Sequence, residues 1–487
     1  MADAIAIHLI NTEQLKTEHS DSSQWCQASG FSGKEGSISL VPDATGQIAK
    51  VLVGLPSKLS TWTLSELPKT LPANTYTLAN NFSDSDATKL YLGWQLGSYS
   101  FDRYKLTKTG LLATLQPPKN ADITYVTAAT EATYLVRDLV TTPSNNMGPD
   151  QLEETARSLA DCYEANVTSI AGGDLVIENY PMIYAVGKAS TRAPRLIDLR
   201  WHSPNATPDS LKVTLVGKGV CFDSGGLDVK SATGMRLMKK DMGGAAQVLG
   251  LAQMIMSMNL PVTLRVLVAA VENSIAGNAL RPLDILTSRK GTTVEVGNTD
   301  AEGRLILADA LWEASSEDPD LLIDCATLTG AARVALGTEL PAFFCNHSQT
   351  TVELLNASQA IDDPLWNLPL YHAYRSLLDS PVADMNNIAS GSYGGAITAA
   401  LFLQEFIQTD LPWIHVDFMA YNLRNLPGRP EGGDAMGMRA LFELIKTRRH
   451  GDTETRRWGD GEMGRHGDAE TRRHGDAETR RRGDGKM

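Results

Sequence analysis

The spacing of apolar residues changes along the chain and divides it into regions. Up to about Ala129, short apolar runs are separated by Gly, Pro, Asn and Ser residues, a pattern typical of strands joined by turns. Strands are expected at residues 37–42, 49–55 and 76–82. This pattern predicts a small N-terminal α/β domain over residues 1–127.

A single helix is expected to join this domain to the rest of the chain. Ala132, Leu135 and Leu139 recur at helical spacing, and the pattern stops at the sequence TTPSNN, where a proline follows two threonines. We therefore assign residues 128–146 to a connecting helix.

Beyond Pro149, helical segments alternate with runs rich in β-branched residues. Helices are expected at residues 150–165, 247–258, 304–316 and 396–408. Strands are expected at residues 211–217, 262–273, 320–330 and 412–421. The alternation predicts a larger α/β domain over residues 147–446, with a central, mostly parallel sheet covered by helices on both faces. Ligands of such sheets bind beyond the carboxyl ends of the strands.

The last segment, residues 447–487, differs from everything before it. From Arg449 onward, sequences such as RHGDAETR repeat with a period of eight and contain almost no apolar residues. Such a segment cannot bury enough surface to fold, so we expect a disordered extension. Its histidines could also chelate metal weakly, but a solvated extension unrelated to activity is the interpretation that we prefer.

Composition mainly excludes classes of protein. The 487 residues include 44 Lys+Arg and 57 Asp+Glu, and the net charge of -13 disfavours a general nucleic-acid binder. No apolar segment approaches the roughly 18 residues of a membrane span, and the N-terminus lacks the features of a signal peptide, so a cytoplasmic protein is expected. Five cysteines without CxxC spacing argue against a disulfide framework and against a thiolate zinc site.

Two glycine-rich stretches concentrate ionisable residues among apolar neighbours. Residues 216–244 read VGKGVCFDSGGLDVKSATGMRLMKKDMGG, and residues 298–305 read NTDAEGRL. Charges in such surroundings cost several kcal/mol each unless a counter-ion or a metal ion offsets the desolvation, on the order of the cost of other buried ions. The stretches therefore predict one site, built from seven ionisable residues: Lys218, Asp223, Lys230, Asp241, Asp300, Glu302 and Arg304.

The order of elements is expected to bring the two stretches together. Lys218 and Asp223 are placed in a loop after a strand that ends at Val216, and Asp300 and Glu302 follow the apolar run VEVGN. Loops that follow parallel strands can converge on one crevice even when they are distant in sequence.

The four carboxylates and a neutral lysine would suit Mn²⁺, Zn²⁺ or Mg²⁺. They supply enough oxygens for two ions if at least two of them bridge, and ions about 3.5 to 4 Å apart can hold a water that becomes hydroxide near neutral pH. Lys218 and Lys230 could each be a neutral ligand or a cation that polarises a carbonyl, and the residues alone leave this open. The alternative is a pair of ordinary charged loops joined by salt bridges. HExxH, GxxxxGK[ST] and GxSxG motifs are absent, which argues against zincins, P-loop proteins and serine hydrolases.

At these residues the sequence resembles the leucine aminopeptidase (cytosol aminopeptidase) family of two-metal metallopeptidases. NTDAEGRL and VGKGVCFDSGGLDVK...MKKDMGG match the two motifs of that family, and the resemblance extends from about Arg137 to Ile445. It implies a metal-dependent enzyme that removes N-terminal residues from short peptides, with two divalent ions per subunit (Mn²⁺ or Zn²⁺, and Mg²⁺ as a third option). It also implies a homohexamer whose active sites face an interior cavity.

The resemblance further implies how the metal ions are held. Asp223 and Glu302 would bridge both ions. Lys218 and Asp241 would complete the site that also receives the free amine of the substrate, and Asp300 would serve the other site.

Catalytic and pocket residues are implied in the same way. Lys230 would polarise the scissile carbonyl, and Arg304 would hold a bicarbonate ion that acts as general base. Met238, Thr327 and Leu328 resemble the positions that line the first side-chain pocket of the family. An apolar pocket of this kind favours leucine but discriminates weakly, because one methylene is worth only about 1 to 3 kcal/mol.

Two features keep alternatives open. The segment HVDFMAYN replaces the HLDIAG-type segment of the family, and it places Phe418, Met419 and Tyr421 near the pocket, so the preferred N-terminal residue is left open. A dipeptidase such as a Cys-Gly hydrolase would share the chemistry, and a substrate panel separates the two. A structural or DNA-binding protein with a vestigial site is the second alternative, although the complete set of seven polar residues and the acidic balance count against it.

Overall fold

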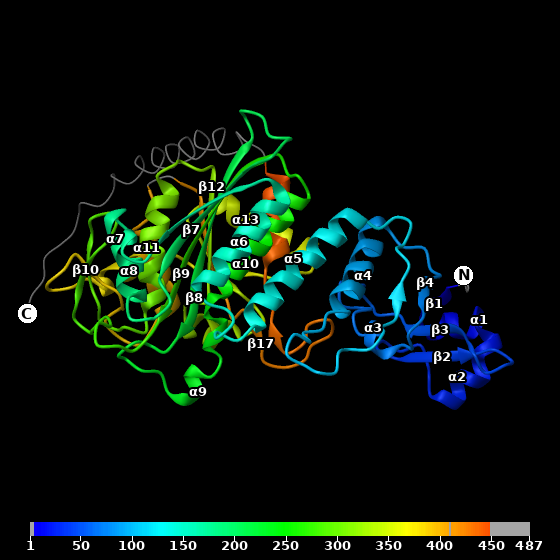
Figure 1. Cartoon of the computed structure of the whole chain (residues 1–487). Helices are drawn as coiled ribbons and strands as arrows, with labels where there is room; N and C mark the ends of the chain where they lie inside the picture. The colour runs from blue at the N-terminus through cyan, green and yellow to red at the C-terminus, as the bar shows by residue number, and fades with distance from the viewer. Residues whose placement is uncertain (1–3, 409–410, 449–487) are drawn as a thin grey trace, which may run out of the picture.

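The computed structural model describes residues 4–408 and 411–448, and it shows two α/β domains joined by a long helix (Figure 1). The disordered extension was predicted over residues 447–487, but Thr447 is the last residue of a helix and Arg448 is buried. The rest of the extension, from Arg449 onward, lies outside the described residues. In the described part of the chain, no helix has the length and apolar composition that a membrane crossing requires.

The N-terminal domain is built on a five-stranded sheet with the strand order β2-β3-β1-β4-β5. Its strands are β1 (Ile5–Ile10), β2 (Ile38–Pro42), β3 (Ile48–Gly54), β4 (Thr75–Leu78) and β5 (Thr114–Leu115). Its helices are α1 (Thr12–Thr17), η1 (Ser20–Ser22), α2 (Ser23–Ser29), α3 (Leu67–Thr70) and α4 (Asp84–Gly97). The three predicted strands are present as β2, β3 and a shorter β4.

The connecting helix, α5 (Ile123–Thr141), begins five residues before the predicted start at Ala128. The side chain of Asp122 accepts a hydrogen bond from the backbone N–H of Tyr125 at 2.9 Å, so it satisfies a free donor of the first turn and fixes the start of the helix. The helix ends at Thr141, five residues before the predicted limit at Asn146, next to the Thr142-Pro143 pair at which the apolar spacing stops.

Arg137 of α5 ties the two domains together. It is fully buried, and its guanidinium donates to Asp434 Oδ1 at 2.8 Å, to the carbonyl of Leu96 at 2.9 Å and to the carbonyl of Gly428 at 2.9 Å. Leu96 belongs to α4 of the N-terminal domain, whereas Asp434 and Gly428 belong to the second domain. A buried arginine requires partners of this kind, because an unpaired charge would not be tolerated there.

The second domain contains a mixed, mostly parallel eight-stranded sheet, ordered β14-β13-β16-β12-β8-β9-β7-β6. Its strands are β6 (Asn166–Ala171), β7 (Arg195–His202), β8 (Leu211–Asp223), β9 (Val262–Asn273), β12 (Leu321–Ala326), β13 (Ala342–Cys345), β14 (Trp366–Asn367) and β16 (Trp413–Asp417). The four central strands β16, β12, β8 and β9 are parallel, and antiparallel pairs flank them. A small three-stranded sheet contains β10 (Ile285–Thr287), β11 (Thr293–Glu295) and β15 (Met385–Asn386). A two-stranded sheet contains β17 (Tyr421–Asn422) and β18 (Gly432–Gly433).

Helices cover both faces of this sheet, as predicted (Figure 1). They are α6 (Pro149–Tyr163), α7 (Asp174–Ile177), α8 (Pro181–Gly187), α9 (Ala232–Met235), η2 (Met238–Met242), α10 (Gly243–Ser257), α11 (Glu302–Ser315), α12 (Gly330–Leu336), α13 (Ser348–Ala360), η3 (His372–Leu378), α14 (Gly395–Gln404) and α15 (Met438–Thr447). Along β9, Val266 and Val268 pack in the core that includes α5, α6, α10 and α15, whereas Leu267 and Ala269 pack in the core that includes α8, α11 and α14. This alternation is the expected consequence of a strand buried on both faces.

Strand β8 is longer than predicted, and this corrects the placement of two site residues. It runs to Asp223 and not to Val216, so Lys218 and Asp223 lie within the strand and not in a loop. Glycine in this stretch indicated a turn, but Gly217 serves close packing: a Cβ there would lie 2.7 Å from the Cα of Ala245 in α10. The pairing of β8 with β9 shifts register between Val220 and Asp223.

Candidate metal centre

The predicted charged residues meet at the carboxyl ends of the central strands. Lys218 and Asp223 come from β8, and Asp241 comes from η2. Asp300 comes from the loop before α11, and Glu302 is the first residue of that helix. Six of the seven predicted residues are joined through direct ion pairs: Lys218, Asp223, Lys230, Asp241, Asp300 and Glu302. The seventh, Arg304, lies in the same first helical turn as Glu302.

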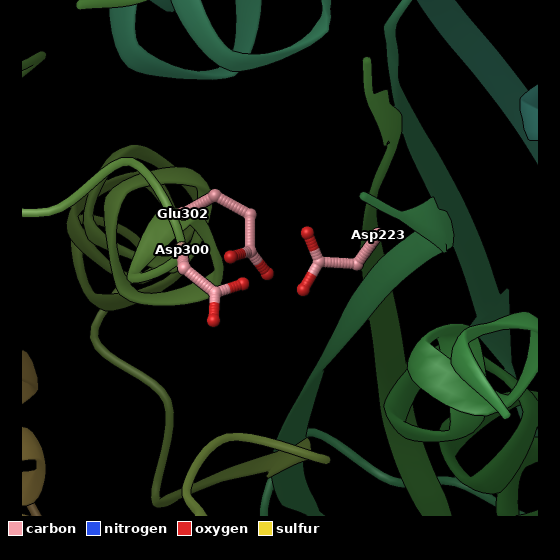
Figure 2. A group of neighbouring side chains, drawn as sticks. All are labelled: Asp223, Asp300 and Glu302. Atoms are coloured by element: carbon pink, nitrogen blue, oxygen red, sulfur yellow. The ribbon is translucent and has the colours of Figure 1, made fainter. Parts of the chain in front are cut away.

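Three carboxylates form the centre of the cluster. One oxygen from each of Asp223, Asp300 and Glu302 lies within 4.8 Å of the others. Figure 2 shows the Asp300 and Glu302 side chains extending from the helix side toward Asp223 on the strand side. Asp223 and Glu302 are buried, and Asp300 is partly exposed. Like charges this close repel one another unless cations lie between or beside them.

Two lysines supply part of the compensating charge. Lys218 Nζ lies 2.7 Å from Asp241 Oδ2 and 2.9 Å from Glu302 Oε1. Lys230 Nζ lies 2.8 Å from Asp223 Oδ2 and also pairs with Asp300. Burial acts to lower the pKa of Lys218, but Asp241 and Glu302 outweigh burial and raise it; Lys230 behaves in the same way with its own two partners.

The lysines leave part of the negative charge uncompensated. Burial, followed by the repulsion from Asp223, raises the pKa of Glu302 to about 8. The same two causes, in the same order, raise the pKa of Asp300 to about 6, even though Lys230 opposes them. Without a further cation, Glu302 therefore retains at neutral pH a proton that it would lose in water, and Asp300 holds its proton to a higher pH than a free aspartate does.

The donor atoms fit divalent metal ions. Asp241 Oδ2, Asp300 Oδ1 and Glu302 Oε1 are buried and accept no aligned hydrogen bond from the described residues, although lysine ammonium groups lie beside them. Buried oxygens without such a bond call for another partner. Carboxylate oxygens in this number are typical ligands of Mn²⁺, Mg²⁺ and Zn²⁺.

Of the three predicted pocket residues, Thr327 contacts Asp241 directly. Thr327 follows β12, and its hydroxyl donates to Asp241 Oδ1 at 2.7 Å. The backbone N–H of Leu328 donates to Asp417 Oδ1 at 3.0 Å, and Met238 is the first residue of η2. Thr327 is therefore a hydrogen-bond partner of a predicted metal ligand. The sequence predicted Thr327 only as a pocket residue and did not predict this contact.

Arg304 has a free donor in a buried position. Its Nη1 donates to the backbone carbonyl of Asn387 at 2.7 Å, whereas its Nε finds no hydrogen-bond partner among the described residues. Burial lowers the pKa of Arg304 to about 10, against the opposing effects of Glu302 and Asp417, so the side chain remains a cation at neutral pH. A buried cation with a free N–H group is suited to an anion.

Two buried asparagines belong to the site but were not predicted. Asn273, the last residue of β9, donates to Asp223 Oδ1 at 2.9 Å and to the carbonyl of Thr299 at 3.1 Å. Its position at the carboxyl end of a predicted strand was a signal that could have identified it. Asn387 contacts the loop that carries Asp300, and its surrounding sequence gave no comparable signal.

A third buried lysine was also missed. Lys240 Nζ lies 3.4 Å from Asp241 Oδ1. Burial lowers the pKa of Lys240 to about 8, although Asp241 opposes this shift. The residue adds positive charge behind a predicted metal ligand.

Two family models match the chain. The model described as "Cytosol aminopeptidase family, catalytic domain" matches residues 134–442, and the one described as "M17 aminopeptidase, N-terminal domain" matches residues 5–118. A relative named "Probable cytosol aminopeptidase" from Syntrophotalea carbinolica is 40% identical over 413 residues, which cover 82% of this chain and 80% of the relative. Peptidase B of Pectobacterium atrosepticum is 41% identical over 317 residues, which cover 64% of this chain and 72% of the relative.

Solved structures show the same similarity. The crystal structure of cytosol aminopeptidase from Coxiella burnetii is 46% identical, with a TM-score of 0.88, and the match covers 92% of this chain and 98% of that one. The bottromycin maturation enzyme BotP in complex with Mn is 32% identical, with a TM-score of 0.82, and the match covers 92% of this chain and 99% of that one.

Proposed function

This chain belongs to the cytosol aminopeptidase family, and from that premise we propose how its own residues carry out the reaction. It is a metal-dependent, leucyl-type aminopeptidase, a hydrolase that removes N-terminal residues from peptides. The observation that carries the proposed site is the cluster of Asp223, Asp300 and Glu302 at the carboxyl ends of the central strands. The dipeptidase and vestigial-site alternatives are not favoured, because the relatives are aminopeptidases and peptidase B.

We propose that the cluster holds two divalent ions, Mn²⁺ or Zn²⁺ with Mg²⁺ as a third option. Asp223 and Glu302 would be the shared ligands, and Asp300 would complete one site. Lys218 and Asp241 would complete the other, with Lys218 as a neutral amine whose proton the incoming ion displaces. When bound, the ions supply the Lewis acid that makes water nucleophilic near neutral pH. The oxygen-rich donor set supports this proposal, and so does the Mn²⁺ in the structure of the relative BotP.

Two cations act on the substrate in this scheme. Lys230 keeps its charge because its acidic neighbours raise its pKa, so it can polarise the scissile carbonyl and stabilise the negative charge that develops on its oxygen. Arg304 would hold a bicarbonate ion, which would supply a general base, and the unpaired Nε of Arg304 supports that role.

The substrate is proposed to be a short peptide with a free N-terminus. The amine lies next to Lys218 and Asp241, and the first side chain enters a pocket lined by Met238, Thr327 and Leu328. We further propose a homohexamer and a cytoplasmic location, the latter supported by the name of the relatives. Selectivity for leucine is expected to be broad, since an apolar pocket separates similar side chains by only about 1 to 3 kcal/mol.

Hydrolysis of Leu-p-nitroanilide and of its N-acetylated analogue by metal-stripped protein tests the function directly. We expect no cleavage without metal, restoration by Mn²⁺ or Zn²⁺, and cleavage of the free-amine substrate alone, because an acetylated nitrogen cannot occupy the amine site. Equal cleavage of both substrates would contradict amine recognition. If no metal restores activity, p-nitroanilides of other residues should be assayed before the pocket assignment is abandoned.

The affinity for metal is expected to depend on pH. In the metal-free protein the pKa of Glu302 is about 8 and that of Asp300 about 6, so protons compete with metal ions below these values. Between pH 6 and pH 8, the apparent affinity for Mn²⁺ should rise by up to about tenfold per pH unit for each proton released. Calorimetric titration in two buffers of different ionisation enthalpy measures both the affinity and the proton release.

The free energy of unfolding of the metal-free protein should fall as the pH rises, whereas the affinity for metal rises. The folded-state pKa of Glu302 is raised above its unfolded value of 4.5, so the folded state binds this proton more tightly than the unfolded state does. The resulting destabilisation is absent below about pH 4.5 and grows as the pH rises toward 8. For metal binding, an apparent affinity for Mn²⁺ that stays constant between pH 6 and pH 8, with no proton release, would contradict the proposed ligands.

A further inference from the structure

We propose that Asn387 is a positioning residue that fixes the metal-ligand loop, residues 297–301, together with Arg304. Asn387 lies just beyond β15, about ninety positions after the loop, and its side chain is fully buried. This inference rests on the proposed function, because the loop matters for catalysis only if Asp300 and Glu302 hold metal ions.

The side chain of Asn387 uses every hydrogen-bonding position of its amide on this one loop. Its Oδ1 accepts from the backbone N–H groups of Gly297 at 2.8 Å and Asn298 at 3.2 Å. Its Nδ2 donates to the carbonyls of Asn298 at 2.8 Å and Ala301 at 3.3 Å. The amide therefore closes the loop at both ends, with Asp300 between the bonded residues and Glu302 directly after them.

The backbone of the same residue extends the clamp. Its carbonyl accepts from Arg304 Nη1 at 2.7 Å, and its N–H donates to the carbonyl of Glu295 at the end of β11. Asn387 thus connects the strand that precedes the loop, the loop itself and the arginine that follows it. It touches neither Met238 nor Leu328 through any of these bonds.

The packing around Gly297 shows that the loop lies in close contact with residues 386–388. A Cβ added at Gly297 would lie 2.4 Å from Asn386 Oδ1 and 2.6 Å from Ile388 Cγ1, the side chains on either side of Asn387. Only glycine allows the loop to approach the 386–388 segment this closely. The position therefore places two requirements on the sequence: a residue without a side chain in the loop and an amide opposite it.

A fixed loop has a physical consequence for metal binding. Without the clamp, the loop would lose conformational freedom when its carboxylates engage an ion, and this entropy cost would weaken binding. Outer hydrogen-bond partners of metal ligands typically change affinity or activity by about 10- to 100-fold when they are removed. A neutral amide can fix the loop without competing with the ion for the carboxylates.

The test compares metal affinity in full-length, metal-stripped variants by titration with Mn²⁺. Asn387→Ala should weaken binding by about 10- to 100-fold. The matched control is Asn346→Ala, because Asn346 makes a similar amide bridge at the opposite ends of the strands, accepting from Trp413 N and donating to the carbonyl of Leu411, both at 2.9 Å. This control should bind Mn²⁺ within about twofold of the parent protein.

Asn387→Asp keeps the test decisive if the alanine variant does not fold. It preserves the volume and the two accepted bonds but removes the two donated bonds. It also adds negative charge near the site, which by Coulomb attraction alone would tighten cation binding. A weaker affinity in this variant can therefore arise only from the loop. An affinity equal to or tighter than that of the parent in every variant that folds overturns the inference.

Hydrogen exchange gives a readout that does not depend on metal. In the metal-free parent, the amides of Gly297 and Asn298 should exchange slowly, because both donate to a buried acceptor, and Asn387→Ala should accelerate them. Rapid exchange of both amides in the parent overturns the inference while leaving the proposed function intact. Failure of the parent itself to bind Mn²⁺ overturns the proposed function, and the inference with it.

Discussion

Replacing Glu302 by glutamine should abolish both tight metal binding and peptidase activity. Glu302 is buried beside Asp223 and Asp300 and is proposed to be shared by both ions. Glutamine has the same shape but lacks the charge, and its single carbonyl oxygen cannot serve two ions as the two oxygens of a carboxylate would. We expect kcat/KM for Leu-p-nitroanilide to fall at least about a thousandfold, since bound metal lowers the activation barrier by several kcal/mol. Steady-state kinetics and Mn²⁺ titration measure the two losses.

The same variant should fold normally. Burial raises the pKa of Glu302 to about 8, so the metal-free protein already disfavours the charged form, and a neutral side chain is tolerated there. At pH 9 the metal-free variant should melt at the same temperature as the metal-free parent or higher. Glu154→Gln, at an exposed position of α6, is the matched control and should leave every measurement unchanged. Full activity in Glu302→Gln would rule out the two-metal scheme.

Replacing Lys230 by methionine should have the second-largest effect, with the opposite result for metal binding. Loss of one preorganised charge at the developing oxyanion is expected to lower kcat by about 10²- to 10³-fold. Lys230 also competes for Asp223 and Asp300, since it pairs with both. Its removal should therefore leave Mn²⁺ affinity unchanged or make it tighter.

Kinetics at saturating metal, together with calorimetric titration, separate these effects. Lys212→Met, at an exposed position near the start of β8 and far along that strand from Asp223, is the matched control. If Lys230→Met retains kcat within about twofold, Lys230 is only a counter-ion. Loss of metal binding in this variant would instead indicate that the lysine is needed to build the site.

The sequence predicted the site because its chemistry is local. Charged residues such as Asp223 and Glu302 stand among glycines and apolar residues, and that contrast is visible without a structure. The layer order of the larger domain was also predictable, because runs such as residues 262–273 are apolar throughout, and β9 occupies those residues. Both features depend on neighbours along the chain.

The errors and omissions depend on neighbours in space. Lys218 and Asp223 were expected in a loop, but β8 continues to Asp223, and Gly217 lies within it at a point where a Cβ would collide with Ala245 of α10. Asn387 has no distinguishing sequence context, because its role is defined by a loop about ninety positions earlier. Asparagine is common in loops that have no such role, so only the folded chain identifies this one.

The shift of register between Val220 and Asp223 limits how this site could be transplanted. Side chains alternate between the faces of a regular strand, so residues five apart point in opposite directions. Lys218 and Asp223 are five apart, yet both reach the neighbourhood of Glu302, because the irregularity in β8 resets the alternation. A designer who grafted these side chains onto an ideal strand of another scaffold would separate them. The irregular segment of β8 must be copied together with the ligands, because it directs the Lys218 and Asp223 side chains to the same side of the strand.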